Sequence, residues 1–145
     1  MHETLLDYLY ESSSHDRVVA FRHRPRLREH RWTYGELSAT AFRFARELET
    51  RGIGRGDRVL IWAENCPEWV AAFYGILLRG AIAVPLDEHG SPDFAARVCR
   101  QTEPKLVLYG RGIDVSHLEI PSIPLEALVE TIASHSADQM AAASI

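Results

Sequence analysis

Residues 54–87 read GRGDRVLIWAENCPEWVAAFYGILLRGAIAVPLD, and this stretch decides the fold class. After a glycine-rich turn comes Val59–Ala63, an apolar run of strand length. Pro67 marks a helix start, because its missing N–H costs nothing in a first turn. The residues that follow it are apolar almost all round, and Ala81–Leu86 is a second apolar run. The stretch therefore predicts a central strand, a buried helix and a second buried strand, the unit of a parallel sheet.

The same alternation of strand and helix continues downstream. Ser91 and Pro92 predict the start of another helix, and Leu106–Tyr109 predicts a third strand. The side chains of this helix that we expect to face inward are Phe94, Ala95, Val98 and Cys99. Helices inserted between apolar strands imply right-handed crossovers. The predicted fold class is α/β, with a mostly parallel layered sheet and flanking helices.

Upstream, Thr33 and Glu36 form a T-x-x-E capping box, which predicts a helix start. Gly52 provides the helix end. The apolar positions between them recur at helical spacing: they are Leu37, Ala41, Phe44, Ala45 and Leu48. Before this helix, Val18–Phe21 and Leu27–Trp32 flank an arginine-rich turn and predict a β-hairpin that precedes the layered sheet.

The chain divides into three predicted segments. Residues 1–16 form an N-terminal helix and linker, residues 17–110 the α/β core, and residues 111–145 a loop, a helix and a weakly structured tail. The apolar positions that indicate the last helix are Leu125, Leu128, Val129 and Ile132.

Composition excludes several classes of function. The 145 residues fit one globular domain, and a net charge of -4 does not favour nucleic acid as a partner. No apolar run reaches the roughly 18 residues of a membrane span, and the N-terminus lacks the pattern of a secretory signal. Cys66 and Cys99 lack CxxC spacing and predict buried free thiols rather than a disulfide or metal pair. We expect a cytoplasmic protein.

Three glycine-containing patterns suggest ligand binding. Residues 52–56 carry G-x-G-x-G, but they follow a helix and precede a strand, the reverse of a dinucleotide-binding loop. Residues 110–112, Gly-Arg-Gly, do follow a strand, yet Val115 stands where a third glycine belongs. Residues 55–57 spell the Arg-Gly-Asp tripeptide of cell adhesion, which has no role without export. We interpret the first and the third as turns and the second as a weak signal.

Charged residues give weak indications of a site. Lys105, the only lysine, opens an apolar run, a poor place for a Schiff-base or phosphate-binding lysine. Asp87 and Glu88 follow a predicted strand, where open α/β sheets place ligands, but with no partner group in sight we favour a structural role. The seven histidines lack metal-ligand spacing: they are His2, His15, His23, His30, His89, His117 and His135.

One basic cluster has the charge to bind phosphate, nucleic acid or an acidic partner. It contains Arg22, Arg24, Arg26, Arg28 and Arg31, with His23 and His30 among them. Glu29 interrupts the cluster and no aromatic ring is interleaved with it, so we favour a solvated hairpin.

Four motifs carry a resemblance to a known family. They are WTYGEL at 32–37, GRGDRV at 54–59, NCPEW at 65–69 and LLRGAIAVPLD at 77–87. Together they resemble the opening of an AMP-forming acyl-CoA synthetase of the adenylate-forming superfamily, within the N-terminal portion of its large domain. The NCPEW helix start is more similar to acyl-CoA and aryl-CoA ligases than to peptide synthetases.

The resemblance implies a two-step reaction. ATP and a carboxylate form an acyl-adenylate with loss of pyrophosphate, and the thiol of coenzyme A then displaces AMP, with magnesium neutralising phosphate charge. The chain contains nothing like the family's Ser/Thr/Gly-rich phosphate loop, TSGTTGxPKG in outline. In the family the catalytic lysine and most of the acyl pocket also lie downstream of this region. No catalytic, cofactor-binding or metal-binding residue is therefore assigned.

The leading hypothesis is an N-terminal fragment of an acid:CoA ligase, with a fatty acid as the default substrate and no activity in isolation. Its expected partners are the remainder of the ligase polypeptide and, through an exposed sheet edge, a second copy of itself. A complete, non-catalytic binding or dimerisation module is the alternative. A small-molecule-binding α/β domain is a third reading, which calorimetric titration with ATP would test.

Overall fold

The computed structural model describes residues 4–12, 19–23 and 30–142. The α-helices in these residues are α1 (Leu5–Ser12), α2 (Tyr34–Thr50), α3 (Pro67–Leu78), α4 (Pro92–Thr102) and α5 (Leu128–Thr131). The strands are β1 (Val19–His23), β2 (His30–Thr33), β3 (Arg58–Trp62), β4 (Ile82–Leu86), β5 (Leu106–Tyr109) and β6 (Ser122–Pro124). Two short 3-10 helices are η2 (Ser116–Leu118) and η3 (Leu125–Ala127).

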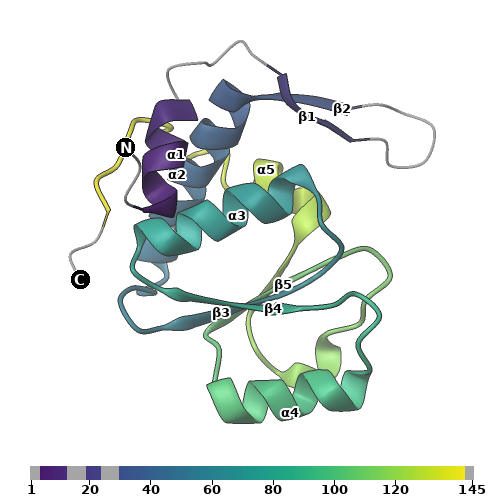
Figure 1. The fold of residues 1–145 in the computed structure, drawn as a ribbon. Helices are drawn as coiled ribbons and strands as arrows, with labels where there is room; N and C mark the ends of the chain where they lie inside the picture. The colour runs from purple at the N-terminus through teal and green to yellow at the C-terminus, as the bar shows by residue number, and fades with distance from the viewer. Residues whose placement is uncertain (1–3, 13–18, 24–29, 143–145) are drawn as a thin grey trace.

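Four strands form one parallel sheet in the order β4-β3-β5-β6. Figure 1 shows α2 and α3 on one face of this sheet and α4 on the other. The predicted α/β class with a parallel layered sheet is thus confirmed, and β3 is an inner strand as expected. The predicted hairpin is also present, since β1 pairs with β2 in antiparallel fashion. Val18 and Leu27, which we included in it, lie outside the described residues.

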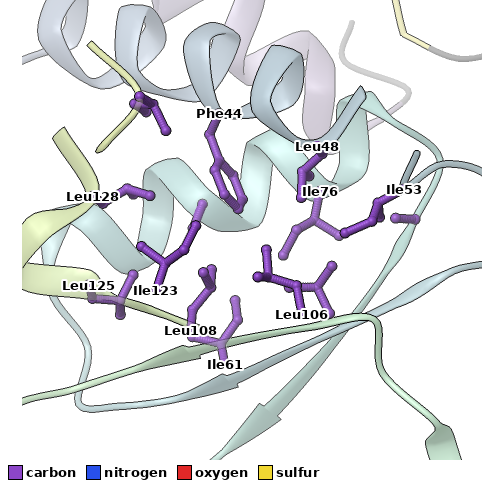
Figure 2. Close-up of a cluster of buried hydrophobic side chains, with 14 of the residues drawn as sticks. Phe44, Leu48, Ile53, Ile61, Ile76, Leu106, Leu108, Ile123, Leu125 and Leu128 are labelled. Atoms are coloured by element: carbon purple, nitrogen blue, oxygen red, sulfur yellow. The ribbon is translucent and has the colours of Figure 1, made fainter. Parts of the chain in front are cut away.

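The strands bury side chains on both faces of the sheet. Ile61 and Leu108 point towards α2 and α3 and join the main core, shown in Figure 2. Leu60 and Val107 point the other way and form a second core with Ala95 and Cys99 of α4. This two-sided burial explains why these strands are continuous apolar runs and not alternating ones.

Helix α2 begins as its capping residue predicts. Thr33 Oγ1 accepts a hydrogen bond from the Glu36 amide at 3.0 Å, and Thr33 is the N-cap. The helix stops before Gly52, whose φ of +72° lies in the left-handed region that favours glycine. Against α3, α2 packs so closely that a Cβ on Gly75 would stand 2.7 Å from Phe44 Cδ2. Only glycine fits at this crossing.

Strand β4 corrects one prediction. We expected it to be buried, but it lies at the edge of the described sheet and Ile82 is 45% exposed. One hydrogen bond shows which residues of β4 bond towards β3: the Ile82 amide donates to Asp57 O, just before β3, at 2.7 Å. Alternate residues of a parallel strand bond to opposite sides, so Ala83 and Pro85 direct their backbone groups outward. The missing N–H of Pro85 therefore falls on the open edge, where proline is tolerated.

Two helices are less buried than predicted. The outer side of α3 leaves five apolar side chains partly exposed: Trp69, Val70, Phe73, Tyr74 and Leu77. On α4, Ala95 and Cys99 face the core as predicted, but the expectation for Phe94 was wrong, because its ring is 45% exposed. The Arg97 guanidinium carbon lies 5.8 Å from the centroid of that ring, so Phe94 packs under a neighbouring side chain of its own helix.

Residues after Gly110 add to the core more than their composition indicates. Strand β6 extends the sheet beyond β5 and was not predicted. Leu125, Leu128 and Ile132 are buried in the main core, as their spacing predicts, whereas Val129 is 42% exposed. A third core joins α1, α2 and α3 through Leu9, Ala41, Phe42, Ala45 and Leu78. Among the described residues, no helix is both long and apolar enough to cross a membrane.

Candidate functional site

The carboxyl ends of β3 and β5 mark the place where an α/β sheet of this order binds ligands. From β3 the chain crosses to β4 on one side, and from β5 it goes on to β6 on the other. The connections that follow the two strands therefore lead to strands on opposite sides of this pair, and such a switch point opens a crevice in many α/β proteins. Candidate ligand-binding groups are expected in the loops that follow β3, β4 and β5.

The loops after β3 and β5 lie in contact in this chain. The Gly110 amide donates to Trp62 O at 2.9 Å. A Cβ on Gly110 would stand 3.0 Å from the Cβ of Ala63, tighter than ordinary contact. Glycine at 110 therefore serves this close approach between the two loops.

The two acids that follow β4 are engaged locally. Asp87 Oδ1 accepts from the His89 amide at 2.8 Å, and Asp87 O accepts from the Gly90 amide at 2.9 Å. Glu88 Oε1 lies 3.4 Å from Nε2 of the exposed His89 ring. These contacts shape a turn and support the structural role that we favoured for Asp87 and Glu88.

Arg111 and Trp62 complete the carboxyl edge. Arg111 Nε and Nη2 both donate to Glu126 Oε2, at 3.1 and 2.8 Å. The Trp62 indole is buried beside Gly90, and no described residue accepts a hydrogen bond from its N–H. Sequence reasoning missed this unpaired donor, because a tryptophan at the end of an apolar run is indistinguishable from other core residues. The described edge brings together no nucleophile, base and oxyanion donor of the kind that catalysis needs.

Lys105 lies at the opposite, amino edge of the sheet. Its Nζ is 3.0 Å from Asp57 Oδ1, and the Gly54 amide donates to Asp57 Oδ2 at 2.9 Å. The glycine-rich turn therefore supplies its amide to a side chain of its own turn, which confirms its structural interpretation. Lys105 pairs with that turn and is remote from any carboxyl-edge ligand.

Two contacts hold the pKa of Asp57 below its ordinary value of 3.8. The hydrogen bond from the Gly54 amide has the larger effect, and the contact with Lys105 adds to it. A depressed carboxyl pKa stabilises the fold above the unfolded pKa, and this stabilisation disappears as pH falls through the folded value. We expect Asp57→Asn to lower the free energy of unfolding by about 1 kcal/mol at pH 7. The difference from wild type should shrink as pH drops below 3.8. Urea unfolding at pH 7 and pH 3 measures it, and a difference that is equal at both pH values contradicts the assignment.

Both cysteines are free thiols, as predicted, although Cys66 is only partly buried. Burial, with smaller contributions from the nearby Glu68 and Glu64, raises the pKa of Cys66 to about 12. Because the thiolate is the reactive form, we expect Cys66 to react with Ellman's reagent at pH 8 roughly 1,000-fold more slowly than an ordinary thiol. Comparison with Cys66→Ser separates its rate from that of Cys99, and rapid reaction of folded Cys66 would overturn the prediction.

Two candidate binding features remain. Within the ranges that the structure describes, no group of three or more His, Cys, Asp or Glu residues could hold a metal ion. The side chains of the basic cluster lie outside the described part of the structure. For Arg22, His23, His30 and Arg31 only the backbone is described, and Arg24, Arg26 and Arg28 lie outside the described residues altogether. The described part of the chain is therefore a packed scaffold whose polar groups mostly serve its own turns.

Comparison with known proteins connects this scaffold to a family. Residues 12–143 match the model of the AMP-binding enzyme family. The chain belongs to this family. The assignment agrees with the four motifs at 32–37, 54–59, 65–69 and 77–87, which all lie inside the matched region.

Similar AMP-binding enzymes include ligases for fatty and aromatic acids. The chain is 36% identical over 88 residues to a fatty acid–[acyl-carrier-protein] ligase of Mycobacterium marinum, covering 61% of this chain and 17% of that protein. It is 45% identical over 60 residues to a 3-hydroxybenzoate/4-hydroxybenzoate–CoA ligase of Thauera aromatica, covering 41% of this chain and 12% of that one. The chain therefore matches a small part of the length of these relatives.

A solved AMP-binding enzyme shows the same fold. The fatty acyl-adenylate ligase of L. pneumophila, in complex with acyl adenylate and pyrophosphate, superposes with a TM-score of 0.76 and 26% identity. The superposition covers 98% of this chain and 26% of that structure. The fold described above is thus the fold of part of an adenylate-forming ligase.

Proposed function

We propose that this chain is the N-terminal scaffold of an acid:CoA ligase, most simply a fatty acyl-CoA synthetase. The complete enzyme joins a carboxylate to AMP with loss of pyrophosphate and then transfers the acyl group to the thiol of coenzyme A. The family match over residues 12–143 carries this proposal. Relatives that act on fatty acids and on hydroxybenzoates support the general reaction.

We place the binding of ATP, magnesium and coenzyme A on the remainder of the ligase. The described residues do not fit a magnesium site, because no carboxylate cluster is present among them and Asp87 serves its own turn. The isolated chain is accordingly proposed to be inactive. The ligase is proposed to work in the cytoplasm, a reducing compartment that suits the free thiols Cys66 and Cys99.

The proposed partner is the remainder of the ligase polypeptide, packed against the outer side of α3 and the edge of β4. Trp69 and Phe73 stack there with ring centroids 5.5 Å apart and are both partly exposed. Ile82 of β4 adds a side chain that is 45% exposed. Exposed aromatic and aliphatic side chains of this kind mark interaction surfaces. Without the remainder, we expect the isolated chain to associate with itself through this surface.

The alternative function, a complete binding or dimerisation module, has one observation in its favour. Both faces of the sheet are covered and three buried cores are formed within the described residues. This degree of burial suits a unit that folds by itself. The two proposals differ in activity: only a ligase catalyses exchange of pyrophosphate into ATP in the presence of a fatty acid.

The deciding experiment reads the source gene past the codon for Ile145 and assays its product for that exchange. We expect an open frame that continues into a Ser/Thr/Gly-rich loop with a lysine. The longer product should catalyse exchange, and the 145-residue chain should not. A stop codon after Ile145 contradicts the scaffold proposal and favours the module.

A further inference from the structure

The chain after α5 crosses α2 and reaches α1. Residues 135–140 form neither helix nor strand, yet they have specific contacts with both helices. Figure 1 shows this C-terminal stretch beside α1. Its contacts do not enter into the proposed ligase function.

Two arginines of α2 bind this segment through its backbone. Arg43 Nε donates to His135 O at 3.1 Å. Arg46 Nη1 donates to Ser136 O at 3.0 Å and to Asp138 O at 2.7 Å. Positions 43 and 46 are three residues apart and share one face of the helix. Hydrogen bonds from a charged donor are stronger than those between neutral groups.

Two further contacts fix the ends of the segment. At its start, His135 Nε2 lies 3.4 Å from Glu47 Oε1, and Glu47 also holds Arg51 at 3.2 Å. At its end, the Tyr10 hydroxyl of α1 donates to Met140 O at 3.1 Å. The segment is thereby attached to α2 and α1 at separate points.

The segment also covers apolar surface. Met140 packs against the third core, which contains Leu9 of α1, Phe42 of α2 and Leu78 of α3. Removal of the segment would uncover this part of the core while leaving the sheet and its two larger cores intact.

We propose that residues 135–140 are a detachable strap, latched by Arg43 and Arg46, that closes over the core between α1 and α2. The latch binds carbonyl groups, which every residue possesses. The hydrogen bonds from Arg43 and Arg46 therefore do not depend on which side chains stand at positions 136–139. Opening requires the loss of four hydrogen bonds, two of them exposed and two partly buried, together with the His135–Glu47 contact and one methionine contact. So few local contacts can be lost without global unfolding. When the strap leaves α2, the apolar side chains between α1 and α2 that Met140 covers become exposed.

Cleavage by proteinase K tests the latch, with the cut sites read by mass spectrometry. Arg43→Gln with Arg46→Gln should speed cleavage within residues 133–142 at least tenfold while the urea midpoint of the whole domain changes little. Arg100→Gln on α4 is the matched control, because Arg100 is exposed and its helix covers the face of the sheet opposite α2. Gln139→Ala should also leave the rate unchanged, since it retains every backbone carbonyl.

A separate variant covers the case in which the double arginine variant fails to fold. Tyr10→Phe removes only the hydroxyl that donates to Met140 O, and it should speed the same cleavage by a smaller factor. If the folded double variant and Tyr10→Phe were both cleaved within residues 133–142 at the wild-type rate, the proposal that these side chains hold the strap would be wrong. Cleavage of wild type as fast as a free peptide of residues 133–145 would overturn the closed strap itself.

Discussion

Phe44→Ala is expected to lower the free energy of unfolding by roughly 3–5 kcal/mol, the range for a fully buried aromatic ring. Phe44 is completely buried between α2, α3 and the sheet, as Figure 2 shows. Its ring also fills the space beside Gly75, where a Cβ would be only 2.7 Å from Phe44 Cδ2. Truncation would therefore leave a cavity at the closest approach of the two helices. Urea unfolding followed by tryptophan fluorescence measures the loss.

Phe94→Ala is the matched control for this prediction, because it makes the same chemical change on α4. Phe94 is 45% exposed, so we expect a loss below about 1 kcal/mol. If Phe44→Ala and Phe94→Ala lowered the free energy of unfolding by similar amounts, Phe44 would not be packed in the main core between α2 and α3 as described.

Leu128→Ala is expected to cost roughly 2–5 kcal/mol, the range for a buried leucine. Leu128 is the first residue of α5, a helix of four residues, and is completely buried in the main core. So short a helix has little stability of its own, and its position depends on packing of this kind. The same urea experiment measures the effect.

Val129→Ala serves as the neighbouring control, since Val129 is 42% exposed. We expect it to change stability by less than about 0.5 kcal/mol. If Leu128→Ala were equally mild, the residues after Gly110 would be an appendage of the α/β core, and their burial in the main core would be refuted.

Local signals predicted much of this fold. The Thr33 cap, the turn at Gly52 and the apolar run of β3 each depend on interactions within a few residues, and all three were confirmed. Backbone geometry and short-range hydrogen bonds determine such features, so the sequence contains them directly.

Features that depend on distant neighbours were not predictable in this way. An apolar run such as β4 has the same composition at an edge as in the centre of a sheet, and only the strands beside it decide its burial. Strand β6 has three residues and ends in Pro124, too short and too rich in proline for a strand signal. It forms because β5 offers an unpaired edge to which the Ser122–Pro124 backbone can bond.

In the candidate site, too, local features were predictable from the sequence and contacts between distant residues were not. The glycine turn at residues 52–56 could be interpreted from its order relative to helix and strand, and the contact of Gly54 supports that interpretation. The pairing of Arg111 with Glu126 could not be predicted, because the two residues are brought together by β6 and η3. The unpaired indole N–H of Trp62 likewise depends on the three-dimensional position of the Gly90 turn.

The outward position of Pro85 has a consequence for how this chain behaves in concentrated solution. A strand from another molecule that aligned with β4 would find the Ala83 N–H but no second donor at Pro85, two residues further on. Open edges with a full row of donors are the templates on which fibrils grow. We therefore expect Pro85 to oppose the addition of a further strand at this edge, so that copies meeting through this region would associate through side chains and not through a continued sheet.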